Sequence, residues 1–198
     1  MPTNKTSVVQ IRDIEKSFKK GRAQELLVLD RVNFDMHEGE IIALLGRSGS
    51  GKSTLLRIIA GLIQPSAGSV SFHEQPITEP VQGLTMVFQH FALLPWLTVL
   101  DNVELGLQAI GMSRVKRRQR ALEAIDAVGL DGFESAYPKE LSGGMSQRVG
   151  LARALVLDPE VLLMDEPFSA LDVLTAENLR GDLIDIWQSD DTNIKSVL

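Results

Sequence analysis

The sequence feature that most constrains the fold is the stretch GRSGSGKST at residues 46–54. It matches the pattern G-x-x-x-x-G-K-[ST] and lies between the apolar segment EIIALLG and the segment KSTLLRIIAGL, whose apolar residues have helical spacing. Glycines allow the backbone to curl so that successive N–H groups point inward around phosphate oxygens. A strand before the turn and a helix after it distinguish a phosphate-binding loop from an ordinary Gly/Ser-rich turn. We therefore expect an α/β fold that binds a nucleotide at this loop.

The residues of the loop have distinct expected roles. Lys52 would reach the β- and γ-phosphates, and the Ser53 hydroxyl would bind Mg²⁺. We expect the whole stretch to contact the nucleotide, that is, Gly46, Arg47, Ser48, Gly49, Ser50, Gly51, Lys52, Ser53 and Thr54.

A second stretch, VLLMDEP at residues 161–167, supplies the acidic groups that such chemistry needs. Its unbroken apolar run is typical of a strand buried on both faces. Asp165 at the end of this strand would hold Mg²⁺, commonly through water. Glu166 would orient or deprotonate the attacking water. The alternative is an acidic pair that simply ends a strand, and the phosphate-binding loop argues against it.

The rest of the chain predicts an inserted helical region. VNFDMHEGEIIALLG reads as a strand, a turn and a second, buried strand, the helix after the loop ends at Gly61, and SAGSVSFHEQPIT reads as a hairpin. From about Trp96 to Ala136 the pattern becomes helical. SRVKRRQRALEAIDAVGL predicts a helix with Ser113 as N-cap and Gly129 as its stop, and with Leu122, Ile125 and Val128 near one face.

Composition excludes several classes of protein. The net charge of -6 argues against a nucleic-acid partner, and the basic run SRVKRRQR is expected to be a solvated helix face. The chain has no cysteine, which excludes a disulfide scaffold. No apolar run reaches the length of a membrane span, and the first ten residues show no signal-peptide pattern.

A second phosphate-binding turn is predicted at LSGGMSQR, residues 141–148. Ser142-Gly143-Gly144 opens a predicted helix, and the N–H groups at a helix start favour an anion. An ordinary N-capping serine is the simpler alternative for Ser142 alone. Together with the phosphate-binding loop and MDEP, in that order, however, this stretch resembles the signature of ATP-binding cassette ATPases, and the resemblance covers nearly the whole chain.

The resemblance implies a P-loop NTPase (RecA-like) core with an N-terminal antiparallel β subdomain, formed by residues 1–88 and 147–198. A helical subdomain carrying the signature would occupy residues 89–146. In the family, two cassettes sandwich two ATP molecules, so the second turn would bind the ATP of a partner copy. Ser142, Gly143 and Gly144 would then donate to phosphate in trans, and Gln147 would lie near the ribose.

Further positions match the family one by one. In MVFQH, Gln89 would touch Mg²⁺ and water and would join the helical subdomain to the membrane partner. In SALD, Asp172 would cross the dimer interface. In KSFKKG, Phe18 would stack on adenine, although a phenylalanine near a strand is commonly a core residue. The resemblance thus implies Glu166, Gln89 and Lys52 as catalytic residues and Ser53, Gln89 and Asp165 as Mg²⁺ ligands.

The chain departs from the family in one respect. A switch histidine is expected at the end of the strand that follows MDEP, but no histidine occurs after His90. We expect either a chain truncated before this residue or an incomplete hydrolytic apparatus, and we favour truncation. A non-hydrolysing, ATP-dependent dimerisation module therefore stays open as an alternative.

LLPW, DNVELGL and FSALDVLTAENLR are similar to the nitrate, sulfonate, taurine and bicarbonate importer group. This similarity implies a bacterial ATPase on the inner face of the cell membrane, with transmembrane permease subunits and, indirectly, a substrate-binding protein. Trp96 follows the glutamine loop, where the family contacts its membrane subunit. An exporter or lipoprotein-releasing ATPase shares every motif, and a soluble cassette acting on DNA or ribosomes is a more distant alternative.

Overall fold

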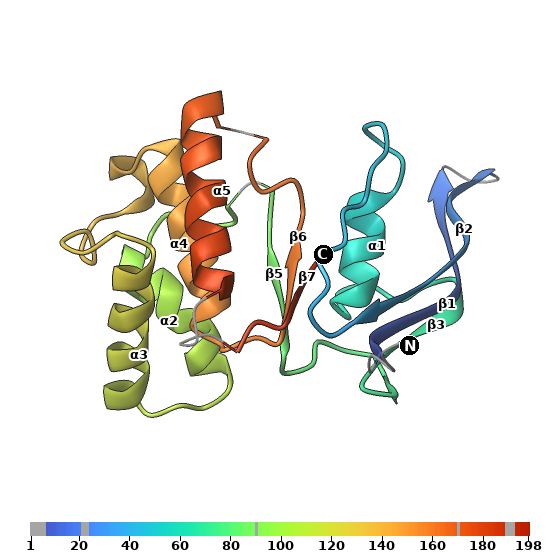
Figure 1. Cartoon of the computed structure of the whole chain (residues 1–198), viewed down its shortest axis with the longest axis horizontal. Coiled ribbons are helices and arrows are strands. Elements are labelled where there is room, and N and C mark those ends of the chain that lie inside the picture. The colour runs from blue at the N-terminus through green and yellow to red at the C-terminus, as the bar shows by residue number, and fades with distance from the viewer. Residues whose placement is uncertain (1–6, 21–23, 90, 170, 189–192) are drawn as a thin grey trace. The chain divides into compact units, whose positions relative to one another are not determined.

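The computed structural model describes residues 7–20, 24–89, 91–169, 171–188 and 193–198. The chain divides into two compact units, one formed by Met1–Leu84 with Lys195–Leu198 and the other by Thr85–Ile194. Each unit combines strands with at least one helix, so the expected mixed α/β fold is confirmed (Figure 1).

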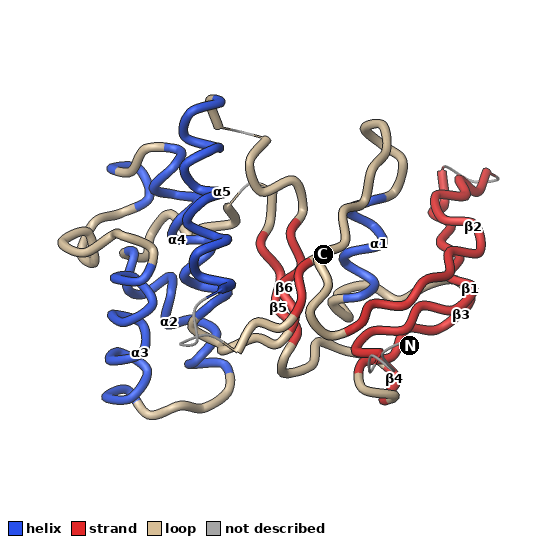
Figure 2. The backbone as a smooth tube through the Cα atoms, viewed as in Figure 1, coloured by secondary structure: helices blue, strands red, loops and turns tan. Residues whose placement is uncertain are grey.

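The first unit contains an antiparallel sheet with the strand order β2-β1-β3-β4. The long central strand buries Val9, Ile11 and Ile14 completely on its core side. The predicted hairpin at residues 66–78 is confirmed as β3 and β4, in which Phe72 pairs with Gln75. The strands, drawn red in Figure 2, are β1 (Ser7–Lys20), β2 (Gln24–His37), β3 (Ala67–Phe72) and β4 (Gln75–Pro76).

Helix α1 (Lys52–Ile59) follows the phosphate-binding loop, as the sequence predicts. Its buried face carries Leu55, Leu56, Ile58 and Ile59. The helix stops as expected at Gly61, which has a left-handed φ of 71°. The N–H of Leu62 then bonds to the carbonyl of Arg57 and closes the helix end.

The prediction of a fully buried strand at EIIALLG is wrong. This segment forms no strand and has one parallel bridge, between Ile41 and Val197 of β7 (Ser196–Val197). Ile41 is 58% exposed and Leu45 is 93% exposed. A buried strand needs a neighbour at each edge and a layer on each face, and within its own unit this segment has a single bridge. An apolar run alone does not provide those neighbours.

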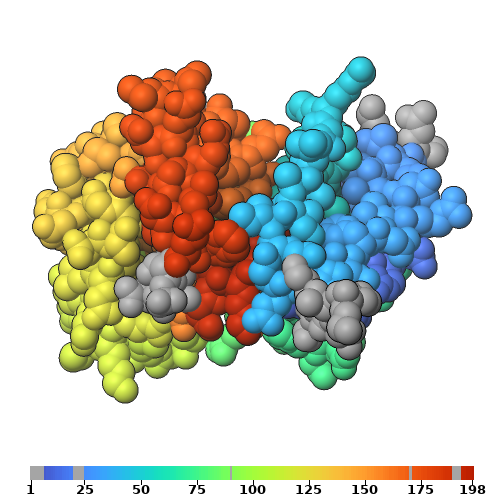
Figure 3. All heavy atoms as spheres, in the orientation of Figure 1, coloured from blue at the N-terminus to red at the C-terminus, as the bar shows by residue number. Residues whose placement is uncertain are grey.

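The second unit packs helices beside two neighbouring strands, β5 (Leu84–Val87) and β6 (Val161–Met164). The prediction of a buried strand at VLLM is confirmed, because Val161, Leu162 and Leu163 are all 0% exposed. Helix α4 contacts α2, α3 and α5, and α5 lies on the face shown in Figure 3. The helices are α2 (Val99–Ala109), α3 (Arg114–Ala127), α4 (Gly143–Leu155), α5 (Val173–Gln188) and the short 3₁₀ helix Pro138–Glu140.

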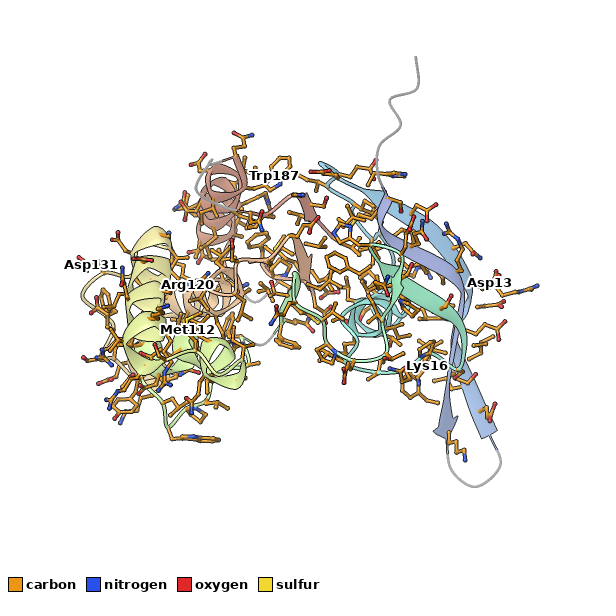
Figure 4. All side chains as sticks on the ribbon, turned by 90° about the horizontal axis from the view of Figure 1, so that it is seen from below. Asp13, Lys16, Met112, Arg120, Asp131 and Trp187 are labelled. Carbon is orange, nitrogen blue, oxygen red and sulfur yellow. The ribbon has the colours of Figure 1, made fainter. Side chains whose placement is uncertain are left out.

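Helix α3 confirms the helix expected at residues 113–128, with Ser113 at the N-cap position and Gly129 in a left-handed conformation after its end. The predicted apolar face needs one correction, because Leu122 is 41% exposed. The buried stripe instead contains Ala121, Ile125 and Val128. These residues are spaced by four and three positions and so share one face, whereas Leu122 is turned about 100° away from Ala121. Arg120 on α3 and Trp187 on α5 are labelled in Figure 4.

Candidate functional site

The phosphate-binding loop is built around the side chain of Lys52. Its Nζ donates to the carbonyl of Gly46 over 3.0 Å and to that of Arg47 over 3.4 Å, so the ammonium group lies across the loop. The N-cap of α1 is Gly51, which provides no side-chain hydrogen bond to the first turn. A helix start of this kind presents backbone N–H groups and a positive dipole end to an anion. The loop therefore fits a phosphate group.

Gly51 also explains why the loop needs glycine. Its φ is 96°, and a Cβ atom here would lie 2.8 Å from Leu29 Cδ2 and 3.1 Å from the carbonyl oxygen of Val28. The loop thus rests directly on β2, the neighbour of the strand that carries Phe18. Within the loop, the N–H of Ser50 bonds to the carbonyl of Arg47 and closes the turn.

Phe18 lies on β1 in the same unit as the loop, and it is 43% exposed. The Nζ atom of Lys16 lies 5.3 Å from the centre of the Phe18 ring. Lys16 projects from this strand in Figure 4. A half-exposed ring has a face free for stacking, so Phe18 fits the adenine role that the sequence predicts, and that role stays a prediction.

In the second unit, the end of β6 carries the two predicted acidic residues. Asp165 is 2% exposed, and its backbone N–H bonds to the carbonyl of Val87 over 3.0 Å. Glu166 follows with a left-handed φ of 47°, and its carbonyl accepts hydrogen bonds from both the N–H and the hydroxyl of Ser169. The strand end therefore buries Asp165 and turns the exposed Glu166 away from it.

The structure brings Gln89 and Glu166 together. Gln89 Nε2 donates to Glu166 Oε2 over 2.9 Å, although the two residues are 77 positions apart in the sequence. A carboxylate held by an amide in this way is fixed in position to accept a proton or to orient water. His90, which follows Gln89, lies outside the described residues.

The residues proposed for Mg²⁺ have suitable chemistry. Ser53 offers a hydroxyl, Gln89 an amide oxygen and Asp165 a carboxylate, and hard oxygen donors of this kind suit Mg²⁺. Ser53 belongs to the first unit and the other two to the second. Among the described residues, no group of three or more His, Cys, Asp or Glu side chains is placed so that it could hold a metal ion.

The second predicted phosphate turn is the exposed start of α4. Ser142 is the N-cap, and its Oγ accepts a hydrogen bond from the N–H of Met145 over 3.2 Å. Ser142 therefore acts as an ordinary helix N-cap, as the simpler alternative predicts. The same hydroxyl still has its own proton to donate, because a serine can accept and donate at once. Capping and phosphate binding are compatible in this residue.

Gly144 and Asp172 meet at Thr175 on α5. A Cβ atom on Gly144 would lie 2.7 Å from Thr175 Cγ2, so only glycine allows this approach. Asp172 accepts from the Thr175 N–H over 3.0 Å and from its hydroxyl over 2.6 Å. These bonds, the side-chain bond first, lower the pKa of Asp172. Oδ1 of Asp172 thus caps the start of α5 and Oδ2 holds the Thr175 hydroxyl, beside the start of α4.

Gln147 has a different environment from the other predicted site residues. Its side chain is 3% exposed and faces a small cavity with Val87, Phe168 and Leu179. Among the described residues, its Oε1 atom accepts no hydrogen bond. Contact with a ribose would require this side chain to leave the interior, and the role of Gln147 stays a prediction.

Residues 29–169 match the protein family described as ABC transporter. The chain belongs to the ATP-binding cassette family. It is 48% identical over 180 residues to the nitrate import ATP-binding protein NrtD of Synechocystis, a match that covers 91% of this chain and 67% of the relative. It is 52% identical over 159 residues to a taurine import ATP-binding protein of Rhizobium johnstonii, covering 80% of this chain and 61% of that protein. The chain thus spans about two thirds of the length of these relatives.

A solved dimeric structure of an ATP-binding cassette bound to ADP and Pi is also similar to this cassette. The TM-score is 0.83 with 37% identity, covering 96% of this chain and 85% of that one. The P-loop NTPase fold expected from the motifs is therefore confirmed. None of the helices in the described residues of this cassette is long and apolar enough to cross a membrane.

Three residues that contact the segments of the site were not predicted from the sequence, namely Asn102, Arg153 and Thr175. Asn102 and Arg153 bond to the backbone of the loop that follows Gln89, and Thr175 bonds to Asp172 at the start of its own helix. Asn102 is a buried polar residue in the helix that follows the glutamine loop. A polar residue at a core position of an amphipathic helix was the one signal that could have found it.

Proposed function

We propose that this cassette binds and hydrolyses MgATP as the nucleotide-binding subunit of a bacterial importer. The observation that carries the proposal is the family match over residues 29–169, which includes the phosphate-binding loop, Gln89, the signature and Glu166. We further propose that the transported solute is a small anion such as nitrate, sulfonate, taurine or bicarbonate. The names of the nitrate and taurine import relatives support this group. They favour an importer over the exporter alternative.

In this proposal each site residue has a defined task. Bound MgATP would supply the phosphoryl group and the metal charge. Lys52 would neutralise the terminal phosphates, and Ser53 and Asp165 would hold the metal, together with Gln89. Glu166 would take a proton from the attacking water, and Gln89 would hold its carboxylate in place. Phe18 would stack on the base.

We propose that the start of α4 binds the ATP held by a second copy of this chain. The dimeric cassette among the similar solved structures supports this arrangement. Ser142, Gly143 and Gly144 would donate to the phosphate, Asp172 would face the partner copy and Gln147 would lie near the ribose. The exposed position of Ser142 and Gly143 fits a contact with another molecule.

We also propose that the division into a nucleotide-binding core (residues 1–88 and 147–198) and a helical subdomain (residues 89–146) serves transport. The helical subdomain would contact permease subunits at the inner face of the membrane, and a substrate-binding protein would deliver the solute to them. Trp96 supports this proposal, because it is 69% exposed on the loop that follows Gln89. Trp96→Ala should abolish transport in the reconstituted importer while leaving basal ATP hydrolysis nearly intact. Equal loss of both would contradict a coupling role.

Isothermal titration with MgATP tests the binding part of the proposal. Lys52→Ala removes charge-assisted hydrogen bonds to phosphate, each worth about 1.5–3 kcal/mol, so the Kd should rise at least about tenfold. Lys116→Ala, which removes an exposed lysine of α3, is the matched control and should leave the Kd unchanged. Equal affinities for Lys52→Ala and the wild type would contradict nucleotide binding at this loop.

A further inference from the structure

The loop between Gln89 and Thr98 connects β5 to α2 and has an unusual backbone (Figure 1). Phe91 and Ala92 are consecutive and both left-handed, with φ values of 54° and 48°. Residues other than glycine rarely adopt this conformation, and they keep it only when their surroundings impose it. Two such residues in a row therefore require an external partner that fixes them.

Arg153 on the signature helix α4 is that partner. Its Nη2 donates to the carbonyl of Phe91 and its Nη1 to the carbonyl of Ala92, each over 2.6 Å. A planar guanidinium presents its donors to two carbonyls in a rigid fork, whereas the donors of a lysine ammonium rotate freely at the end of a flexible stem. The Arg153 side chain is partly buried, and burial lowers its pKa, but an arginine stays charged under all ordinary conditions.

A second contact holds the same part of the loop against α4. The Phe91 carbonyl oxygen would lie 3.6 Å from a Cβ atom on Gly150, so the loop backbone rests on the helix one turn before Arg153. Further along, buried Asn102 accepts from the Leu94 N–H and donates to the Leu97 carbonyl. The loop is thus attached to α4 at its start and to α2 at its end.

We propose that Arg153 is a positioning residue that locks the loop of residues 89–98 to the signature helix, so that Gln89, Trp96 and the start of α4 move as one body. Gln89 lies two residues before Phe91 and holds Glu166, and Trp96 lies four residues after Ala92. If α4 moves, Arg153 would therefore move Gln89 and Trp96 with it. The consequence for catalysis rests on the proposed ATPase function, whereas the lock itself does not.

Hydrogen exchange of the nucleotide-free chain tests the lock without any activity. The relevant amides are those of Leu94 and Leu97, which bond to Asn102 and to Leu94 respectively. Arg153→Met keeps the apolar stem but removes both bonds to the loop. We expect exchange in the peptide covering residues 91–98 to become at least about tenfold faster, while exchange in β6 stays unchanged. Arg153→Lys keeps the charge but lacks the fixed fork of the guanidinium, so it should give an intermediate rate.

Arg148→Met is the matched control, because Arg148 is another arginine of α4 with two partners, the Val128 carbonyl and Asp182. It should leave the exchange of the loop within about twofold of the wild type. The side-chain amide resonance of Gln89, assigned with Gln89→Ala, should shift in Arg153→Met and stay in place in Arg148→Met. This second readout reports the bond to Glu166 directly.

Two results would overturn the proposal. One is loop exchange in Arg153→Met that stays within about twofold of the wild type. The other is acceleration that is equal in the loop and in β6, because Arg153 would then stabilise the unit as a whole without positioning the loop. If Arg153→Met does not fold, Arg153→Lys is judged by the same two criteria. If the wild-type chain does not hydrolyse ATP, the proposed function is contradicted, but the exchange results still test whether Arg153 positions the loop.

Discussion

Gln89 Nε2 lies 2.9 Å from Glu166 Oε2 and donates a hydrogen bond to it. The two residues come from different segments, the end of β5 and the end of β6, and these strands are neighbours in one sheet. Glu166 reaches this position with a left-handed backbone, which a glutamate adopts rarely. The sheet therefore sets the distance between the proposed base and the amide that holds it.

Gln89→Glu should shift the pH dependence of ATP hydrolysis. The substitution would place two carboxylates within hydrogen-bond distance, and two carboxylates sharing one site retain a proton to higher pH. We expect the acidic limb of the pH–rate profile to move up by about one unit or more. Gln119→Glu is the control, because Gln119 donates to Glu123 over 3.0 Å on the exposed face of α3. Identical profiles for Gln89→Glu and wild type would contradict a catalytic role of the pair.

Gly144→Ala should destabilise the fold by about 1–3 kcal/mol, because the new methyl group would overlap Thr175 Cγ2. Thr175→Ser removes this atom and keeps the hydroxyl that bonds to Asp172. The double variant should therefore recover most of the loss, as measured by urea unfolding. Gly143→Ala is the matched control, since its Cβ would lie at an ordinary 3.5 Å from Leu171. If the changes in unfolding free energy of the two single variants simply add in the double variant, the two positions are not in contact.

The Asp172 cap should make stability depend on pH in the acidic range. Hydrogen bonds from Thr175 lower the pKa of Asp172 below its ordinary value of 3.8. The stabilisation is thus complete well above pH 3.8 and is lost as the pH falls through the lower pKa of the folded state. Asp172→Asn also caps a helix but does not titrate. The difference in unfolding free energy between wild type and Asp172→Asn should shrink with falling pH, and a constant difference would contradict the cap.

Asn102→Leu should cost about 2–4 kcal/mol of stability, because Asn102 is 0% exposed and its removal takes away the bonds it makes to the Leu94 N–H and the Leu97 carbonyl in the part-buried loop. Urea unfolding measures this loss. Asn33→Ala is the control, since Asn33 makes similar bonds to Asp13 and Arg31 on an exposed surface. It should cost about 1 kcal/mol or less. Similar losses at both positions would argue against a special role of Asn102.

The helices and strands that could be predicted from the sequence are those whose pattern lies within one short stretch of the chain. The helix at residues 113–128 followed from its spacing and its closing glycine, and the strand at VLLM followed from its apolar run. The same reasoning failed for EIIALLG, because burial of a strand depends on neighbours that an apolar run does not specify. The spacing of apolar residues also placed Leu122 on the buried face of its helix. A stripe through Leu122 and a stripe through Ala121 both fit the sequence, and only the packing partners decide which of the two is buried.

The motifs predicted the identity of the candidate site residues but not what holds them. Arg153 bonds to carbonyls 61 and 62 residues away, and a carbonyl acceptor leaves no trace in the side-chain sequence. The double use of Ser142, as a helix cap and as an available donor, also became visible only from its bond to Met145. Contacts between distant segments therefore had to come from the structure.

We propose that two copies of this chain share ATP sites in which Glu166 is the base, and MgATP hydrolysis measured over a range of protein concentrations tests this claim most directly. Glu166→Gln is the background, because glutamine can still accept the hydrogen bond from Gln89. We predict a rate per molecule that rises with protein concentration in the wild type and is absent in Glu166→Gln. A rate per molecule that is independent of concentration, or ATP binding with no hydrolysis above the Glu166→Gln background, would contradict the claim.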